Sequence, residues 1–169
     1  MKRLLRRLAT AAFARFPGLT ERWLDRNPMA VADDVPWTPF TGTLAGARLG
    51  LVTTAGVHGT DQPAFDTGDP DGDAGWRVLD GSLQPGAFTI THDYYDTTSA
   101  RADLDVVFPL RRARELVRAG RLGGLTEQHA GLMGHVDGPL LETLTSETAP
   151  AIAEMFRDQR ADIVLLAPA

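Results

Sequence analysis

The chain has 169 residues, of which 17 are basic and 22 acidic, so its net charge at neutral pH is −5. With 43% hydrophobic and 23% charged residues, the composition is typical of one globular domain and excludes disordered and collagen-like chains. The sequence contains no cysteine, which excludes disulfides, cysteine-ligated zinc, iron–sulfur clusters and a thiol nucleophile within residues 1–169.

The N-terminal segment is basic, whereas the rest of the chain is acidic. Residues 1–26 carry seven basic and two acidic side chains, which leaves a net charge of −10 for residues 27–169. Because phosphate binding needs a basic surface, this acidic body argues against nucleic acid as a partner.

The first sixteen residues place leucine, alanine and phenylalanine at helical spacing with arginine between them, which predicts an amphipathic helix. Such a helix can lie on a membrane surface, dock on a partner or serve as a transit peptide, but packing on its own domain or on a sister subunit of a homo-oligomer is favoured. A linker with three prolines follows, so we divide the chain into a helix and linker, residues 1–40, and a domain, residues 41–169. No apolar run reaches the ~20 residues of a membrane span, so we expect a cytoplasmic protein.

Within the domain, short apolar runs alternate with helical patterns. Strands are predicted over residues 49–52, 87–91, 105–108 and 163–166, and helices over residues 110–119 and 146–159. Residues 61–86 are rich in Asp, Gly and Pro and predict a loop, and residues 121–141 form a less regular stretch with five glycines. Strands that alternate with helices indicate an α/β layered domain with a mostly parallel sheet.

The histidines mark the candidate site. His58 follows the first predicted strand and His92 ends the second, and in open α/β sheets the loops at the carboxyl ends of strands form the binding crevice. The segment from Thr91 to Asp96 is dense in groups that can move protons or orient a substrate, although a capped loop with a hydrogen-bonded histidine would show the same residues. His129 lies in the glycine-rich stretch.

Metal and nucleotide motifs are weak or missing. Residues 69–80 imitate a calcium-binding EF-hand loop, but the position that needs glycine is Ala74, so a solvated turn is favoured. A zinc site built from several loops, with histidines and Asp93 or Asp96, stays open as an alternative and implies a metal-dependent hydrolase. The sequence has no GxxxxGK[ST], GxGxxG or GxSxG motif.

A series of short motifs in fixed order gives a more specific indication. Together they resemble the selenoprotein B family of glycine/sarcosine/betaine and D-proline reductases, over about residues 48–167. The motifs are VTTAGVH at residues 52–58, DQP at 61–63, Phe65-Asp66, Gly72-Asp73, Arg77, THDYYD at 91–96, Ala102-Asp103, VFPL at 107–110 and HAGLMG at 129–134.

The resemblance implies reductive cleavage of a carbon–nitrogen bond in a small amino-acid-like substrate. In this family a pyruvoyl group on a partner subunit activates the substrate amine, a selenocysteine or cysteine of the B-type chain attacks the activated carbon, and a thiol-reducing partner protein is expected. Carried over to this sequence, the resemblance gives His92, Asp96 and His129 as candidates for proton transfer. His58, Asp61 and Asp93 are the candidates for lining the substrate crevice.

The family's nucleophile follows a final apolar strand, and this sequence stops at Ala169, where that residue is due. We favour the hypothesis that an in-frame UGA selenocysteine codon was treated as a stop, so that the chain shown is the inactive front portion of a reductase. A truncated gene and a nucleophile-free relative that only binds a ligand or a partner remain alternatives.

Overall fold

The computed structural model describes residues 15–26 and 38–169, which belong to two compact units. One unit consists of residues 1–39 with Asp93–Asp96, and the other of Phe40–His92 with Thr97–Ala169. In the first unit, helix α2 spans Pro17–Arg26 and opens with a proline, which suits the first turn of a helix. Most of the predicted helix over residues 1–16 and most of the predicted linker lie outside the described residues.

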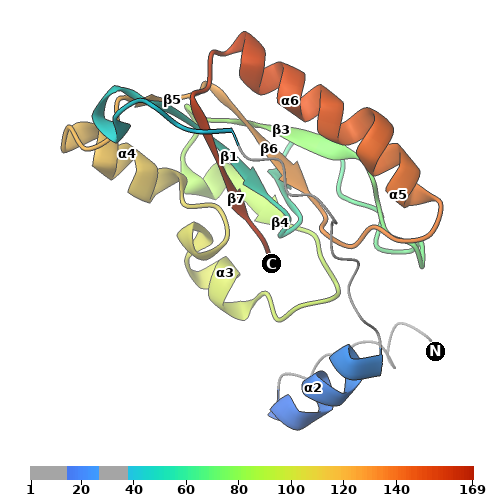
Figure 1. Ribbon diagram of the computed structural model, residues 1–169. Coiled ribbons are helices and arrows are strands. Elements are labelled where there is room, and N and C mark those ends of the chain that lie inside the picture. The colour runs from blue at the N-terminus through green and yellow to red at the C-terminus, as the bar shows by residue number, and fades with distance from the viewer. Residues whose placement is uncertain (1–14, 27–37) are drawn as a thin grey trace. The chain divides into compact units, whose positions relative to one another are not determined.

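The second unit contains a mostly parallel sheet, as predicted, and β1 lies in the centre of this sheet (Figure 1). Strands β5, β6 and β7 all run parallel to β1, and β3 runs antiparallel to β6 at one edge. The five strands are β1 (Arg48–Thr53), β3 (Trp76–Asp80), β5 (Gly124–Leu125), β6 (Gln128–Leu132) and β7 (Ile163–Ala167).

A two-stranded antiparallel sheet accompanies the main one. It pairs β2, Val57–Gly59, with β4, Phe88–Ile90, so that His58 lies opposite Thr89. The predicted strand over residues 87–91 is therefore confirmed as β4. This small sheet places the segments that carry His58 and His92 next to each other.

Three local predictions were wrong. Residues 105–108 do not form a strand, because the Asp103 side chain caps the 3-10 helix Leu104–Val106 by accepting from Asp105 N–H at 3.1 Å. The predicted loop over residues 61–86 contains β3, whose Leu79 is fully buried, and the irregular stretch 121–141 contains β5 and β6. Both stretches are rich in turn residues, so their sequences do not indicate strands. The short strands in them are stabilised by pairing with neighbouring strands of the sheet.

The helices lie on both sides of the sheet (Figure 1). On one side, α6 packs Ile152 and Phe156 against β1 and β6, whereas on the other side Phe108 sits between the rings of Phe88 and His129. The helices are α3 (Thr98–Ala102), α4 (Leu110–Arg118), α5 (Leu140–Thr143) and α6 (Ala149–Asp158), and a π-helical turn, Leu144–Thr148, joins the last two.

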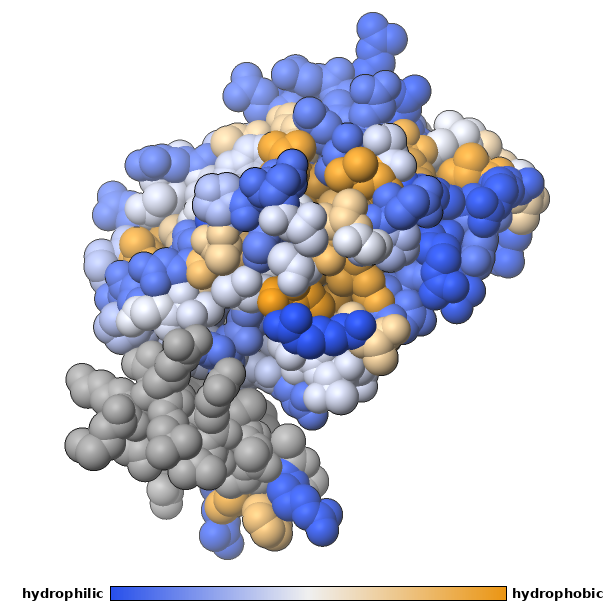
Figure 2. All heavy atoms as spheres, turned by 180° about the vertical axis from the view of Figure 1, so that it is seen from behind, coloured by the Kyte–Doolittle hydropathy of each residue, from blue (hydrophilic) through white to orange (hydrophobic). Residues whose placement is uncertain are grey.

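The surface of the molecule is mixed in character. On the face shown in Figure 2, apolar groups alternate with polar and charged ones. Among the residues described, no helix combines the length and the apolar character that crossing a membrane requires.

Candidate active site

The carboxyl ends of β1, β6 and β7 meet at one edge of the sheet. Thr54, which follows β1, donates its N–H to the carbonyl of Ala167 at 3.2 Å, and its hydroxyl oxygen accepts from Ala169 N–H at 3.1 Å. Gly56 donates its N–H to the carbonyl of Leu132 at 2.8 Å. The loop after β1 is therefore hydrogen-bonded to the ends of β6 and β7, in the region where α/β sheets form their binding sites.

His92 lies at this edge and is buried. Thr91, the residue before it, donates its N–H to the carbonyl of Gly56 at 2.9 Å. Gly56 has a φ of +72°, and a Cβ atom placed there would overlap the Thr91 carbonyl oxygen. The prediction that His92 lies beside the carboxyl ends of the strands agrees with this placement.

His58 is held by hydrogen bonds at both ring nitrogens. Its Nδ1 lies 2.8 Å from the carbonyl oxygen of Gly59, which can only accept, so Nδ1 carries a proton. Its Nε2 lies 2.9 Å from the hydroxyl oxygen of Thr91. The structure therefore joins His58 to the residue next to His92, and the His58 ring orients the Thr91 hydroxyl.

Asp61 is exposed in the turn after β2, whereas its neighbour Gln62 makes the contacts that fix this turn. The Gln62 side chain accepts from Gly59 N–H at 2.7 Å and donates to the carbonyl of Val78 at 2.8 Å. Sequence reasoning missed Gln62, although it lies inside the quoted motif DQP.

His129 lies inside the sheet, away from the edge that holds His92. Its Nδ1 accepts from Leu51 N–H at 3.2 Å, so the ring proton sits on Nε2, which has no hydrogen-bond partner among the described residues. Burial and, to a smaller extent, the nearby Arg114 guanidinium lower the pKa of His129, Asp80 partly opposes them, and the pKa is about 4 as a result. The imidazole is therefore neutral and inaccessible at neutral pH, which favours a structural role over the predicted proton transfer.

Asp93 and Asp96 belong to the other compact unit, together with the N-terminal segment. Their predicted roles in substrate binding and proton transfer therefore stay predictions.

The acidic loop uses its carboxylates as local caps. Asp66 accepts from Gly68 N–H at 2.7 Å, Asp69 from Asp71 N–H at 2.9 Å and Asp73 from Gly75 N–H at 2.7 Å. Within residues 15–26 and 38–169, no group of three or more His, Asp or Glu side chains is arranged to hold a metal ion. The geometry thus favours the solvated turn over the calcium loop and gives no support to a zinc hydrolase.

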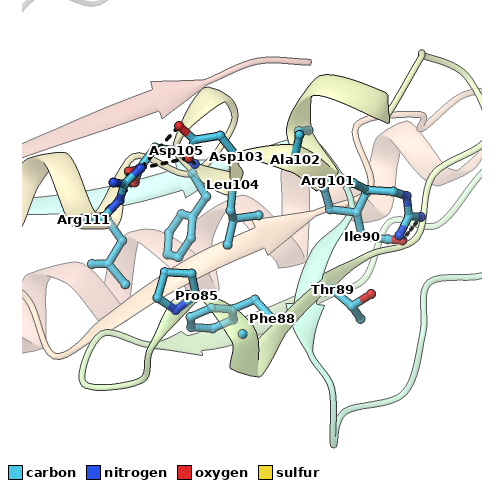
Figure 3. A pocket seen from close by; sticks show the side chains of 14 residues that line it. Pro85, Phe88, Thr89, Ile90, Arg101, Ala102, Asp103, Leu104, Asp105 and Arg111 are labelled. Atoms are coloured by element: carbon cyan, nitrogen blue, oxygen red, sulfur yellow. Dashed lines mark hydrogen bonds and ion pairs between the residues drawn. The ribbon is translucent and has the colours of Figure 1, made fainter.

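A cavity of about 480 Å³ lies between β4, α3 and α4, and sequence reasoning missed it. Figure 3 shows Phe88 and Pro85 on one side, and on the other side Arg111 paired with Asp105 at 2.8 Å. Arg101 donates to the carbonyl of Ile90 at 2.7 Å, two residues before His92. The volume lies in the usual range of small-molecule sites, but none of the six predicted site residues lines the cavity.

Comparison with protein families gives a match over residues 19–169 to glycine/sarcosine/betaine reductase selenoprotein B. The chain belongs to this family. It is 32% identical over 130 residues to the D-proline reductase subunit gamma of Acetoanaerobium sticklandii, a match that covers 77% of this chain and 52% of the relative. It is 29% identical over 148 residues to the glycine reductase complex component B subunit gamma of Symbiobacterium thermophilum, covering 86% of this chain and 34% of the relative.

This selenoprotein B family chain therefore spans about half the length of the first of these relatives and about a third of the second. No solved structure shows a significant match to the chain.

Arg77, Phe65 and Asp73, which belong to the motifs of the family resemblance, contact one another in the structure. The Arg77 guanidinium lies 4.4 Å from the centre of the Phe65 ring and 3.7 Å from the Asp73 carboxylate. Arg77 also donates to the carbonyls of Pro63 and Ala64 at 2.9 and 3.2 Å. Phe65 in turn packs edge-on against the His58 ring at 5.9 Å. These residues anchor the acidic loop beside His58.

Replacement of Arg77 by Gln is expected to lower the free energy of unfolding by about 1–2 kcal/mol, because it removes the contact with Phe65 and the two carbonyl bonds. Urea denaturation measures this change, and limited proteolysis should cleave the loop at residues 62–75 faster. Arg118→Gln, at an exposed position on α4, is the control and should change stability by less than about 0.5 kcal/mol. Equal effects of the two variants would contradict the anchoring role.

Proposed function

We propose that this chain is the γ-type portion of a reductase that cleaves the carbon–nitrogen bond of an amino-acid-like substrate, with a selenocysteine or cysteine nucleophile following Ala169 in a continuing polypeptide. The observation that carries the proposal is the family match through residue 169, together with 32% identity to a D-proline reductase subunit gamma. The 169-residue chain alone is then expected to be inactive, because it holds no thiol or selenol.

The geometry of the sheet edge supports this placement of the nucleophile. The backbone that leaves β7 is bonded to Thr54, so a residue after Ala169 would begin at the edge where β1 and β6 also end. The loop after β1 at this edge also bonds to the residue before His92. Thr54 would thus position the incoming backbone.

In the proposed reaction the carbon–nitrogen bond breaks, and the carbon and the nitrogen each end with a hydrogen. Two electrons come from the chalcogen of this polypeptide and finally from a dithiol protein that is oxidised to a disulfide. His92 and Asp96 would be the first candidates to deliver the proton to the leaving nitrogen, while His58, Asp61 and Asp93 would bind the substrate. A pyruvoyl group would make the amine a better leaving group, and we assign it to another chain, since residues 1–169 hold no cysteine from which it could form.

The codons that follow Ala169 test the proposal directly. We expect a UGA or cysteine codon followed by an open reading frame. An ordinary stop codon without a continuing frame would contradict the proposal. The continued chain, supplied with a dithiol and a pyruvoyl-bearing partner, should oxidise the dithiol in the presence of one of D-proline, glycine, sarcosine or betaine. Turnover by the 169-residue chain alone would also contradict the proposal.

In the continued chain, His92→Ala is expected to lower the turnover number by about 10²–10⁴-fold, which is the usual contribution of a general acid. The free energy of unfolding should change much less. His135→Gln is the matched control, because His135 is a histidine outside the predicted site residues. Its Nε2 contacts the acidic loop, 3.0 Å from the carbonyl oxygen of Pro70. If His92→Ala lost stability in proportion to turnover, His92 would be a structural residue.

A further inference from the structure

Strand β7 is bonded along one edge only. Its five residues pair in parallel register with β1, from Leu49 opposite Ile163 to Thr53 opposite Ala167. In the part of the chain that the structure describes, no strand pairs with its other edge. Figure 1 shows β7 beside β1 at this side of the sheet. A row of backbone N–H and C=O groups therefore stays open to another strand.

The side chains of β7 are apolar and exposed. The exposed fractions of Val164, Leu165 and Leu166 are 42%, 45% and 68%. The residues opposite Leu165 and Leu166 on β1 are Leu51 and Val52, and these are 1% and 7% exposed. Because side chains alternate along a strand, β7 exposes apolar groups on both faces of the sheet.

This combination is unusual for the free edge of a sheet. Edge strands in native proteins carry charges, prolines or bulges that prevent pairing, and the sequence of β7, IVLLA, has no charged residue and no proline. Strands of parallel sheets with such sequences are covered on both faces. The sequence of β7 is thus typical of an inner strand, although β7 lies at the edge of the sheet. Such an exposed apolar edge indicates a docking surface.

The lengths of the relatives indicate what covers this surface. The family match continues through β7 to residue 169, yet the chain corresponds to only 52% of the D-proline reductase subunit gamma. We propose that the open edge of β7 docks the other half of a γ-type polypeptide, which adds a strand beside β7 and covers Leu165 and Leu166. The inference rests on the family membership and not on the proposed reaction.

A fused protein tests this docking. The residues of the Acetoanaerobium sticklandii D-proline reductase subunit gamma that lie outside the 130-residue match would follow Ala169 through a protease-cleavable linker. Hydrogen exchange of the β7 amides should be at least about tenfold slower in the fusion than in the 169-residue chain, because docking removes them from solvent. After the linker is cut, the two parts should elute together on size exclusion.

Matched variants separate docking from a general effect of the fusion. Leu166→Glu should abolish the slower exchange and the co-elution, whereas Leu116→Glu, on an exposed apolar position of α4, should leave both unchanged. Unchanged exchange in the fusion, separation after cleavage, or equal behaviour of the two variants would overturn the proposal. A dimer of the 169-residue chain that Leu166→Glu dissociates would overturn it in favour of a second copy. Because neither readout measures turnover, an inactive but docked fusion would contradict the proposed reaction only.

Discussion

Gly56→Ala is expected to destabilise the chain by about 2–4 kcal/mol. About 1 kcal/mol comes from placing a side chain at a φ of +72°, where only glycine is free of strain. The remainder comes from the new Cβ atom, which would overlap the carbonyl oxygen of Thr91. Because backbone atoms cannot rotate away, the segment that carries Thr91 and His92 must move.

Gly120→Ala is the matched control for Gly56→Ala. Gly120 lies just after α4 and has a φ of +65°, but no atom lies within 4 Å of the place where its Cβ atom would be. This variant should therefore show only the backbone strain, about 1 kcal/mol. Urea denaturation of both variants measures the difference. If the two lost equal stability, the close approach of Gly56 to Thr91 would not be a constraint on the fold.

A second readout links Gly56 to the candidate active site. Movement of the Thr91 backbone would lengthen the 2.9 Å contact between the Thr91 hydroxyl and His58 Nε2. The side-chain NMR signals of His58 should therefore shift in Gly56→Ala and stay unchanged in Gly120→Ala.

The stability of the protein is expected to fall between pH 6.5 and about pH 4 because of His129. The pKa of His129 is about 4 in the folded chain and 6.5 in the unfolded chain. Above pH 6.5 the imidazole is neutral in both states, so it contributes no pH dependence. As the pH falls below 6.5, His129 becomes protonated in the unfolded chain but stays neutral in the folded chain. The free energy of unfolding therefore decreases by about 3 kcal/mol on reaching pH 4.

NMR titration of the four histidines checks this directly in the unmodified chain. The His129 ring signals should not titrate above about pH 5. Urea denaturation at pH 7 and at pH 4.5 gives the second measurement, in which His129→Gln should lose less stability on acidification than the parent chain. His135→Gln should show the same loss as the parent. A His129 signal that titrates near pH 6.5 would contradict the buried, neutral imidazole.

Parts of the candidate site were predictable from local patterns. His58 and His92 each follow a short apolar run, and a run of this kind predicts a strand whose end carries a loop. Their proximity follows from the pairing of β2 with β4, which brings His58 close to Thr91. His129 was assigned a similar role because it too is a histidine in a quoted motif, and only the contacts with Leu51 and Phe108 show that it is buried inside the sheet.

Other parts of the molecule could not be predicted, because they depend on contacts between distant segments. The cavity beside α3 is formed by residues from 85 to 111, and no single motif among them indicates a hollow. The strand β3 lies in a stretch rich in Asp and Gly, and it is stabilised by its pairing with β6, whose residues lie 48 to 56 positions further along the chain.

The sequence by itself determined the family, the α/β class and the apolar character of β7, because residue type and spacing record local burial and chemistry. Only the tertiary structure decided that Thr54 meets Ala169 across 115 residues, that His92 lies at the edge where these strands end and His129 does not, and that β7 has an open side. These features depend on which strands become neighbours, and the pattern of one strand does not specify its partner.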